Sequence, residues 1–130
     1  MAVTKLNLRA DNKESSSSRP ERSMDAFKIT MDGDTESGWI DKEFKGIFSL
    51  GVPAQHALTA KVYGRYKNNN TPDTATETII CDKDGVAKSL DLNQDAEGST
   101  FIIDEAAPFD QVQVVTSGAM TGDLLFGFGA

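Results

Sequence analysis

Four acidic residues are the side chains whose types and spacing best suggest chemistry in this sequence. Counted from the first, they fill positions one, three, five and twelve of an EF-hand calcium loop: Asp32, Asp34, Glu36 and Glu43. Position six, however, is Ser37, where that loop requires glycine, and no helical pattern flanks the segment. The sequence therefore favours an acidic β-turn whose carboxylates cap backbone amides or face water, and it keeps these acids only as minor calcium candidates.

The other reactive side chains do not form a catalytic pattern. His56 is the only histidine, and no G-x-S-x-G nucleophile elbow accompanies it, so we expect a turn or surface residue. Cys81 ends a β-rich run, which indicates a core-facing or strand-end thiol. No glycine cluster precedes a predicted helix, so no phosphate loop is expected. These observations predict a protein that is not an enzyme and that holds no cofactor.

Three aromatic residues leave a carbohydrate-binding module open as an alternative. Trp39, Tyr63 and Tyr66 could stack on sugar rings, as aromatic residues do in carbohydrate-binding β-sandwiches. Tyr63 and Tyr66 are three positions apart, however, so in a regular strand they point to opposite faces. This spacing weakens a planar platform, and Trp39 is more simply explained as an anchor in the core or at a sheet edge.

The elements that would position these residues are β-strands. Apolar residues recur at every second position in most of eight segments, with a mixed run in the fourth: 27–31, 44–52, 58–66, 76–81, 86–92, 99–104, 109–115 and 124–129. No segment carries an apolar helical stripe over three turns. We therefore predict an all-β fold, a single antiparallel β-sandwich or jelly roll of about eight strands over residues 26–130. Residues 1–25 are expected to form a flexible N-terminal arm.

The connections between these segments are rich in Gly, Asn, Asp and Pro. Turns are predicted at 31–38, 66–76, 82–85, 93–99, 105–109 and 116–122, with a turn of 3₁₀ helix before Pro108. The clearest hairpin signal is 76–92, where Asp82 and Asp84 lie in a short turn. A second hairpin is predicted to join 109–115 to 124–129, with Leu124, Phe126 and Phe128 facing the core.

Composition and charge narrow the range of partners. The 130 residues carry a net charge of -7, and residues 1–24 hold five basic and three acidic groups, so the acidic excess lies in the rest of the chain. Such a body repels phosphate backbones, which disfavours nucleic acid as a partner. One cysteine, no apolar run of signal-peptide length and no stretch long enough to span a membrane predict a soluble protein folded in a cytoplasm.

Four segments in order resemble small tailed-phage virion proteins of β-sandwich type: ESGWIDKEFKGIFSLGV, LTAKVYGRYKNN, TETIICDKDGVAKSLDL and APFDQVQVVTSGAMTGDLLFGFG. The resemblance covers roughly residues 36–130. It implies a structural role on the capsid surface, as a decoration (cement) protein bound to the lattice of major capsid protein, or alternatively a tail or head–tail component. It carries over no catalytic residues. Binding around a symmetry axis favours a homo-oligomer, with a trimer preferred.

The expected contact elements are the N-terminal arm and the last strand. The arm contains a serine run at 15–18, and Leu6 and Leu8 alternate as in a short strand that would pair with its own sheet or with another subunit's. The candidate interface residues are Leu6, Leu8, Arg9, Arg19, Arg22 and Leu125.

Overall fold

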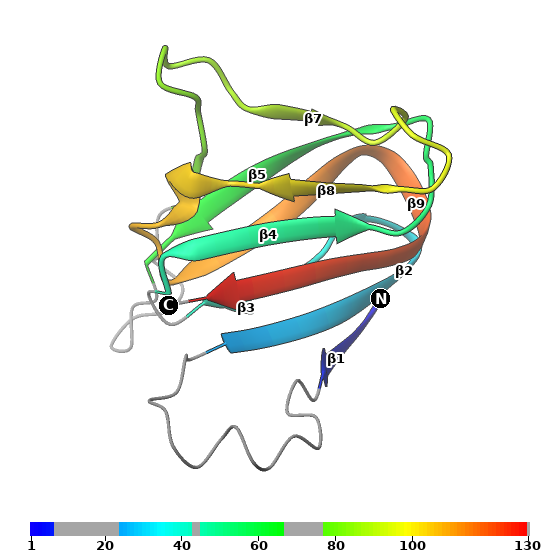
Figure 1. Ribbon diagram of the computed structural model, residues 1–130, viewed down its shortest axis with the longest axis horizontal. Helices are drawn as coiled ribbons and strands as arrows, with labels where there is room; N and C mark the ends of the chain where they lie inside the picture. Colours follow the sequence, from blue (N-terminus) through cyan, green and yellow to red (C-terminus); the bar gives the residue numbers. More distant parts are fainter. Residues whose placement is uncertain (7–23, 43–44, 67–76, 130) are drawn as a thin grey trace.

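The structure, a computed structural model, describes residues 1–6, 24–42, 45–66 and 77–129 (Figure 1). The described elements are β1 (Ala2–Leu6), β2 (Met24–Glu36), β3 (Ile40–Asp41), β4 (Ile47–Val52), β5 (Thr59–Arg65), β6 (Glu77–Ile79), β7 (Ser89–Asp91), β8 (Ser99–Ile102), the 3₁₀ turn η2 (Asp104–Ala106) and β9 (Gln111–Gly129). Every strand pairing is antiparallel, which confirms the predicted all-β fold. The 3₁₀ turn before Pro108 is also confirmed.

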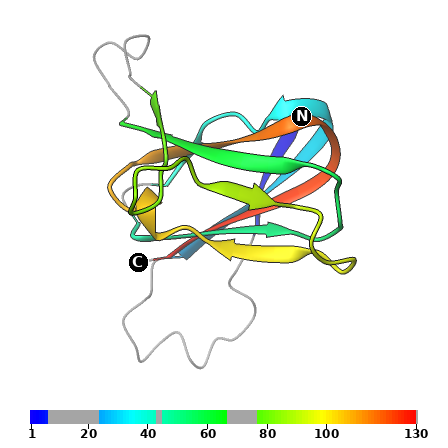
Figure 2. The ribbon, with the colours of Figure 1, turned by 90° about the horizontal axis from the view of Figure 1, so that it is seen from above.

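The strands form two layers that share one long strand, β9. Its second half (residues 120–129) lies between β2 and β4, and with β1 and β8 at the edges these strands make the front layer. Its first half (residues 111–116) lies between β3 and β5, and beyond β5 the strands β6 and β7 complete the back layer. Figure 2 shows β5 and β4 on opposite sides of the molecule, with β9 passing from one layer to the other.

The change of layer takes place at an irregular stretch where β9 faces β2. Asp34 pairs with Met120 and Glu36 pairs with Val115, so β9 spends five residues where β2 spends two. Thr116 closes this bulge by donating its hydroxyl to the carbonyl of Gly118 at 2.7 Å. Because the extra residues bend the strand without reversing it, the predicted hairpin between 109–115 and 124–129 is wrong.

The predicted turn at 31–38 is wrong for the same reason. β2 continues through it to Glu36, and Gly33 adopts a φ of 82° at a register shift of the ladder. Glycine tolerates this left-handed conformation at no steric cost. Between the start of β2 and the end of β3, only Ser37–Trp39 lie outside strands, where the chain passes from one strand to the next.

The predicted hairpin over 76–92 forms only at its tip. β6 and β7 do not pair with each other: β6 pairs with β5 at Tyr63–Arg65, and β7 pairs with β5 at Thr59–Lys61. Between them, Cys81 and Ala87 form an isolated bridge. Residues 81–87 therefore leave the sheet as a projecting hairpin, seen at the upper left of Figure 1.

The core lies between the layers and follows the predicted alternation. Ile29, Leu50 and Val62 are buried on their strands, as are Leu124, Phe126 and Phe128 on β9. The ring of Phe48 lies 5.2 Å from that of Phe126 and 5.4 Å from that of Phe128, which places an aromatic cluster at the centre of the front layer. The core-facing assignment of the last apolar segment is thus confirmed.

The beginning of the chain is part of the sheet. β1 pairs with β2, with Leu6 opposite Ala26, so the short strand pairs within its own chain. The other arm candidates, Leu8, Arg9, Arg19 and Arg22, lie outside the described residues. Within the described ranges, no helix is long and apolar enough to cross a membrane.

Candidate interaction surface

The outer side of the front layer carries small and apolar side chains. Their positions alternate with the buried residues of β4 and β9 and with the half-buried Phe101 of β8, so they point away from the core. We call this surface the front face, and its residues are Ala26, Ile47, Ser49, Gly51, Thr100, Ile102, Leu125 and Gly127. Ile47, Ile102 and Leu125 are 49%, 55% and 36% exposed, so large aliphatic groups on three adjacent strands remain in contact with water.

Small residues keep the front face flat between these aliphatic side chains. Gly127 lies opposite Ser49, and a Cβ at Gly127 would come within 2.7 Å of the Ser49 Oγ. Gly51 lies opposite Leu125, whose Cβ would be 3.4 Å from a Cβ on that glycine. The side chains of Ser49 and Leu125 thus lean over the glycine positions, and the sheet surface between them stays shallow.

A shallow hollow of about 320 Å³ lies at one end of the front face. Its lining residues are Gly51, Val52, Pro53, Glu97, Gly98, Ser99, Thr100 and Leu125. Gly98 has a φ of 96°, and a Cβ there would lie 2.2 Å from the carbonyl oxygen of Val52. Only glycine permits this close approach of the 95–98 turn to β4, so this residue fixes one wall of the hollow.

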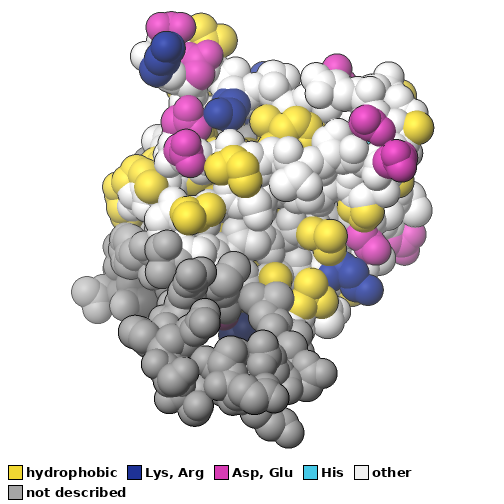
Figure 3. Space-filling model, in the orientation of Figure 1, with side chains coloured by type: hydrophobic (Ala, Val, Ile, Leu, Met, Phe, Trp, Pro, Cys, Tyr) yellow, Lys and Arg dark blue, Asp and Glu magenta, His cyan; other side chains and the backbone are white. Residues whose placement is uncertain are grey.

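Most charged groups on this side of the molecule lie around the front face and not on it. In Figure 3 the middle of this side of the molecule is white and yellow, and acidic and basic side chains gather toward its periphery. Lys28 of β2 lies opposite Leu125 of β9, and Glu97 borders the hollow. Asp123 accepts a hydrogen bond from the Thr30 hydroxyl at 3.0 Å. In a chain of net charge -7, such an uncharged region is suited to burial against another protein.

Around Gln111 the outer side of the back layer, in contrast, is covered by the chain's own side chains. The Arg65 guanidinium stacks 4.3 Å from the centre of the Trp39 ring and donates through Nε to Gln111 at 2.7 Å. Gln111 in turn donates to Asp41 at 2.6 Å. Gln111 and its neighbour Gln113 are only 8% and 7% exposed, although they alternate with the core-facing valines of β9.

This packing does not provide a sugar-stacking platform. Arg65 already lies over the Trp39 ring, while the ring of Tyr66 packs 5.3 Å from that of Phe109. Phe109 fills the space over Gly64, which lies on the core-facing side of β5 with Ala60 and Val62. Tyr63 lies at the opposite position of the strand, beside a small hollow. The three aromatic candidates therefore do not share one face.

The calcium candidates lie on a strand. Asp32, Asp34 and Glu36 are exposed or half-buried residues of β2, and Glu43 lies outside the described residues. The Asp34 carboxylate accepts a hydrogen bond from the Asp32 amide at 3.0 Å and lies 3.2 Å from the amino nitrogen of Met1. The hydrogen bond from the Asp32 amide, and after it the interaction with the amino group of Met1, lowers the pKa of Asp34. Across the described part of the chain, no three His, Cys, Asp or Glu side chains are grouped to hold a metal ion.

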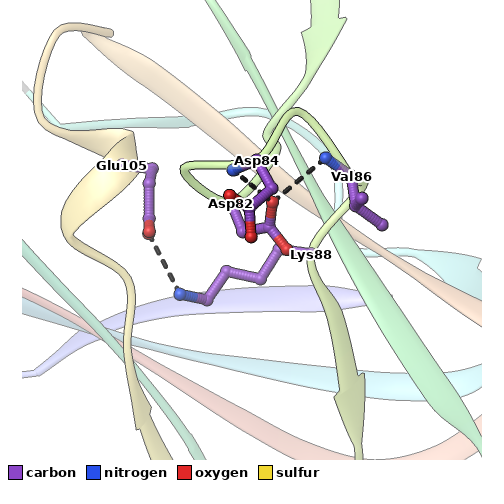
Figure 4. Close-up of polar contacts among 5 residues, drawn as sticks. All are labelled: Asp82, Asp84, Val86, Lys88 and Glu105. Atoms are coloured by element: carbon purple, nitrogen blue, oxygen red, sulfur yellow. Dashed lines mark hydrogen bonds and ion pairs between the residues drawn. The ribbon is translucent and has the colours of Figure 1, made fainter.

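The turn of the projecting hairpin is closed by hydrogen bonds to its own acidic residue. Figure 4 shows the Asp82 carboxylate accepting hydrogen bonds from the amides of Asp84 and Val86, at 2.9 and 3.0 Å. At its base, Lys88 forms an ion pair with Glu105 at 3.0 Å, and a backbone hydrogen bond together with this lysine lowers the pKa of Glu105. Val86 is 61% exposed, so the hairpin is a second place where an apolar side chain meets water.

Lys42 is a buried cation that the sequence patterns did not single out. Its side chain is fully buried, and its Nζ donates to the carbonyls of Lys45 and Ala107, at 2.5 and 3.1 Å. Burial lowers the pKa of this lysine, while the nearby charge of Asp110 opposes that shift. The contacts tie the segment before β4 to the end of η2, which is a structural role.

His56 and Cys81 lie apart from the front face. His56 is half-buried, its amide donates to the Leu92 carbonyl at 2.9 Å, and its ring lies against Gly122 at the bend of β9. Cys81 is a half-buried free thiol at the base of the projecting hairpin. Of the interface candidates, Leu125 lies on the front face and Leu6 ends β1, whereas Ile47 and Ile102 emerge only from the register of the strands.

Comparisons with known proteins do not identify a function for this surface. No protein-family model matches the chain. No significant match is found among curated proteins or among solved structures.

Proposed function

We propose that this chain is a non-enzymatic structural protein of a phage virion, a capsid decoration protein that binds the assembled head lattice through its front face. The observation that carries the proposal is the flat, largely uncharged surface around Ile47, Ile102 and Leu125. The resemblance of the segments between residues 36 and 130 to tailed-phage virion proteins supplies the biological setting. A protein made in the host cytoplasm and located on the capsid surface fits both considerations.

The energetics of the front face suit attachment to a preformed surface. Burying each of these half-exposed aliphatic side chains contributes roughly 1 kcal/mol. The small residues between them keep the sheet surface shallow, so a flat neighbouring surface can cover all three aliphatic side chains at once. Because decoration proteins bind the assembled lattice and not its dispersed subunits, mass action makes every bound copy stabilise the shell. A contact of modest strength then becomes effective when it is repeated over the lattice.

A charge substitution on the front face tests this proposal. In phage particles that carry Leu125→Lys, we expect clearly fewer copies of the protein per head, because the new ammonium would have to be desolvated in the contact. Val86→Lys is the matched control, since it places the same charge on an exposed apolar position of the projecting hairpin. Quantitative mass spectrometry of purified heads and of purified tails measures the number of copies in each.

The same fractions separate the capsid role from its nearest alternative. Protein found on heads, with head stability to heat or low salt reduced when it is missing, supports the decoration role. Protein found only in tail fractions would show a tail or head–tail component and overturn the proposal. Equal occupancy by the Leu125→Lys and Val86→Lys variants would exclude the front face as the lattice contact.

A further inference from the structure

Within the described parts of the chain, the edge strand β8 has a partner strand on one side only. Among the described residues it pairs only with β4, with Phe101 opposite Leu50 and Thr100 opposite Gly51. An open strand edge presents amide and carbonyl groups that another strand can bind. Natural proteins often protect such edges with lysine or proline, whereas the sequence of β8 is Ser-Thr-Phe-Ile.

The hydrogen-bond pattern identifies which groups face the open side. The amide of Ile103 donates to the carbonyl of Phe48 at 2.9 Å, so the main chain at position 103 faces β4. Because these groups alternate along an antiparallel strand, Phe101 also faces β4, while Thr100 and Ile102 direct their amides and carbonyls away from it. Both of these outward-directed residues are exposed.

We propose that β8 pairs in an antiparallel manner with β8 of a second copy of this chain. In this register Thr100 lies opposite Ile102 of the second copy, and the two-fold axis passes between the two Phe101 residues. Each Thr100–Ile102 pair exchanges two hydrogen bonds, so the symmetric contact satisfies all the outward-directed groups of both residues. This pairing does not depend on the proposed capsid role.

The shape and sequence of the edge favour a second copy over a longer foreign strand. The open edge is bounded by the 95–98 turn, closed by the amide of Gly98 on the carbonyl of Asp95 at 3.1 Å, and by η2. It therefore accommodates a strand as short as β8 itself. Antiparallel pairing also places Thr100 beside the Ile102 side chain on the front face and the two Phe101 rings beside each other on the inner face, which are favourable cross-strand pairs.

The dimer would extend the front face across both copies. The two front layers would become one continuous sheet, with the exposed Ile102 residues near its centre. A two-fold axis is the natural symmetry for a strand that pairs with itself, in place of the trimer expected from the sequence. Glu97 and Asp104 flank β8, so the two copies repel each other at the ends of the contact. Added salt should therefore strengthen the dimer.

The test uses the full chain at increasing concentration. Sedimentation equilibrium should show monomers converting to dimers, and hydrogen exchange should show the amides of Thr100 and Ile102 gaining protection only as the dimer forms. The amide of Ile103 should be protected at every concentration because it bonds within the chain. Thr100→Pro removes an outward-directed amide from each copy and should raise the dimer dissociation constant about tenfold or more. Thr100→Val keeps that amide and is the matched control.

The outcomes are clearly separated. A chain that stays monomeric, with Thr100 and Ile102 exchanging freely at all concentrations, would overturn the proposal. A trimer would do the same, as would a dimer that forms equally well with Thr100→Pro and leaves the Thr100 amide unprotected. The exchange measurement uses the unaltered chain, so the result does not depend on whether the proline variant folds.

Discussion

The two halves of β9 present the same backbone in different surroundings. In the first half, residues 111–116, Val112 and Val114 face the core, and the outward-directed Gln111 and Gln113 are nearly buried as well, with Arg65 and Asp41 bonded to Gln111. In the second half, residues 120–129, one face holds the aromatic core and the other carries the exposed Leu125 beside the half-buried Gly127. One strand thus has a closed half and an open half.

The two halves differ in whether side chains of the same chain cover the outer face of the strand. The closed half is covered by side chains that satisfy one another, from Trp39 through Arg65 to Gln111 and Asp41. The open half has no comparable cover among the described residues, and from Leu125 onward its outer positions are small or aliphatic. A surface of this composition gains free energy when another apolar surface covers it.

The largest effect on stability is expected from shortening a core side chain in the open half. Phe126→Ala should lower the free energy of unfolding by about 3 to 5 kcal/mol, because it empties the centre of the aromatic cluster. Leu125→Ala, one residue away on the front face, should change it by less than about 1 kcal/mol in the isolated protein. Urea unfolding followed by circular dichroism measures both values.

Similar losses from the two variants would mean that the front face is packed in the isolated chain. In that case the open half would be covered after all, and the lattice contact would have to lie elsewhere. A large loss for Phe126→Ala alone supports the contrast, since the two side chains differ by only one position along β9.

The sequence predicts the faces of the strands well but their connections poorly. Alternation identifies the core side of β4, β5 and β9, because a residue's direction in a strand depends only on local geometry. The residues around Gly118 are equally compatible with a reversal or with a bulge, and only the pairing of Glu36 with Val115 decides between them. That pairing joins distant parts of the chain, so no local pattern contains it.

The candidate surface follows the same division. Leu125 can be predicted from alternation within its own segment. Ile47 and Ile102 join it only because β4 lies between β9 and β8, which is a property of the sheet order. The burial of Gln111 could not be predicted either, since glutamine is usually exposed and its cover comes from Asp41 and Arg65.

A second test addresses the closed half. Gln111→Ala should lower the free energy of unfolding by about 1 to 2 kcal/mol, because it removes hydrogen bonds to Arg65 and Asp41 from a nearly buried site. It should also change the intrinsic fluorescence of Trp39, the only tryptophan, since the stacked Arg65 loses its anchor. Urea unfolding and emission spectra of the folded protein provide the two measurements.

Gln55→Ala is the matched control for this substitution. Gln55 donates one hydrogen bond to the carbonyl of Asn93 at an exposed site, so we expect a change within about 0.5 kcal/mol. If Gln111→Ala behaves like Gln55→Ala and leaves the tryptophan emission unchanged, the side chains over the closed half do not act as a cover, and the contrast between the halves is lost.

The smallest expected effect concerns the ion pairs beside the open half. Asp25 lies opposite Phe128, and its carboxylate is 3.1 Å from Lys45 and 3.4 Å from Lys5. The Asp25 carboxylate accepts a hydrogen bond from Lys45, and this bond, followed by the charge of Lys45 and by the hydrogen bond and charge of Lys5, lowers the pKa of Asp25 below its ordinary value. The ionised carboxylate therefore stabilises the fold at every pH above the ordinary pKa of an aspartate. This contribution is lost as the pH falls through the lowered pKa of Asp25.

Asp25→Asn should consequently cost about 0.5 to 1 kcal/mol of unfolding free energy at neutral pH and almost nothing in strong acid. Urea unfolding of both proteins across that pH range measures the difference, and Glu97→Gln, at an exposed acid beside the hollow, controls for the change in net charge. A loss of equal size at both ends of the range would show that Asp25 acts through packing. The edge of the open half would then be held by the same close contacts that cover the closed half, and not by ion pairs at its border.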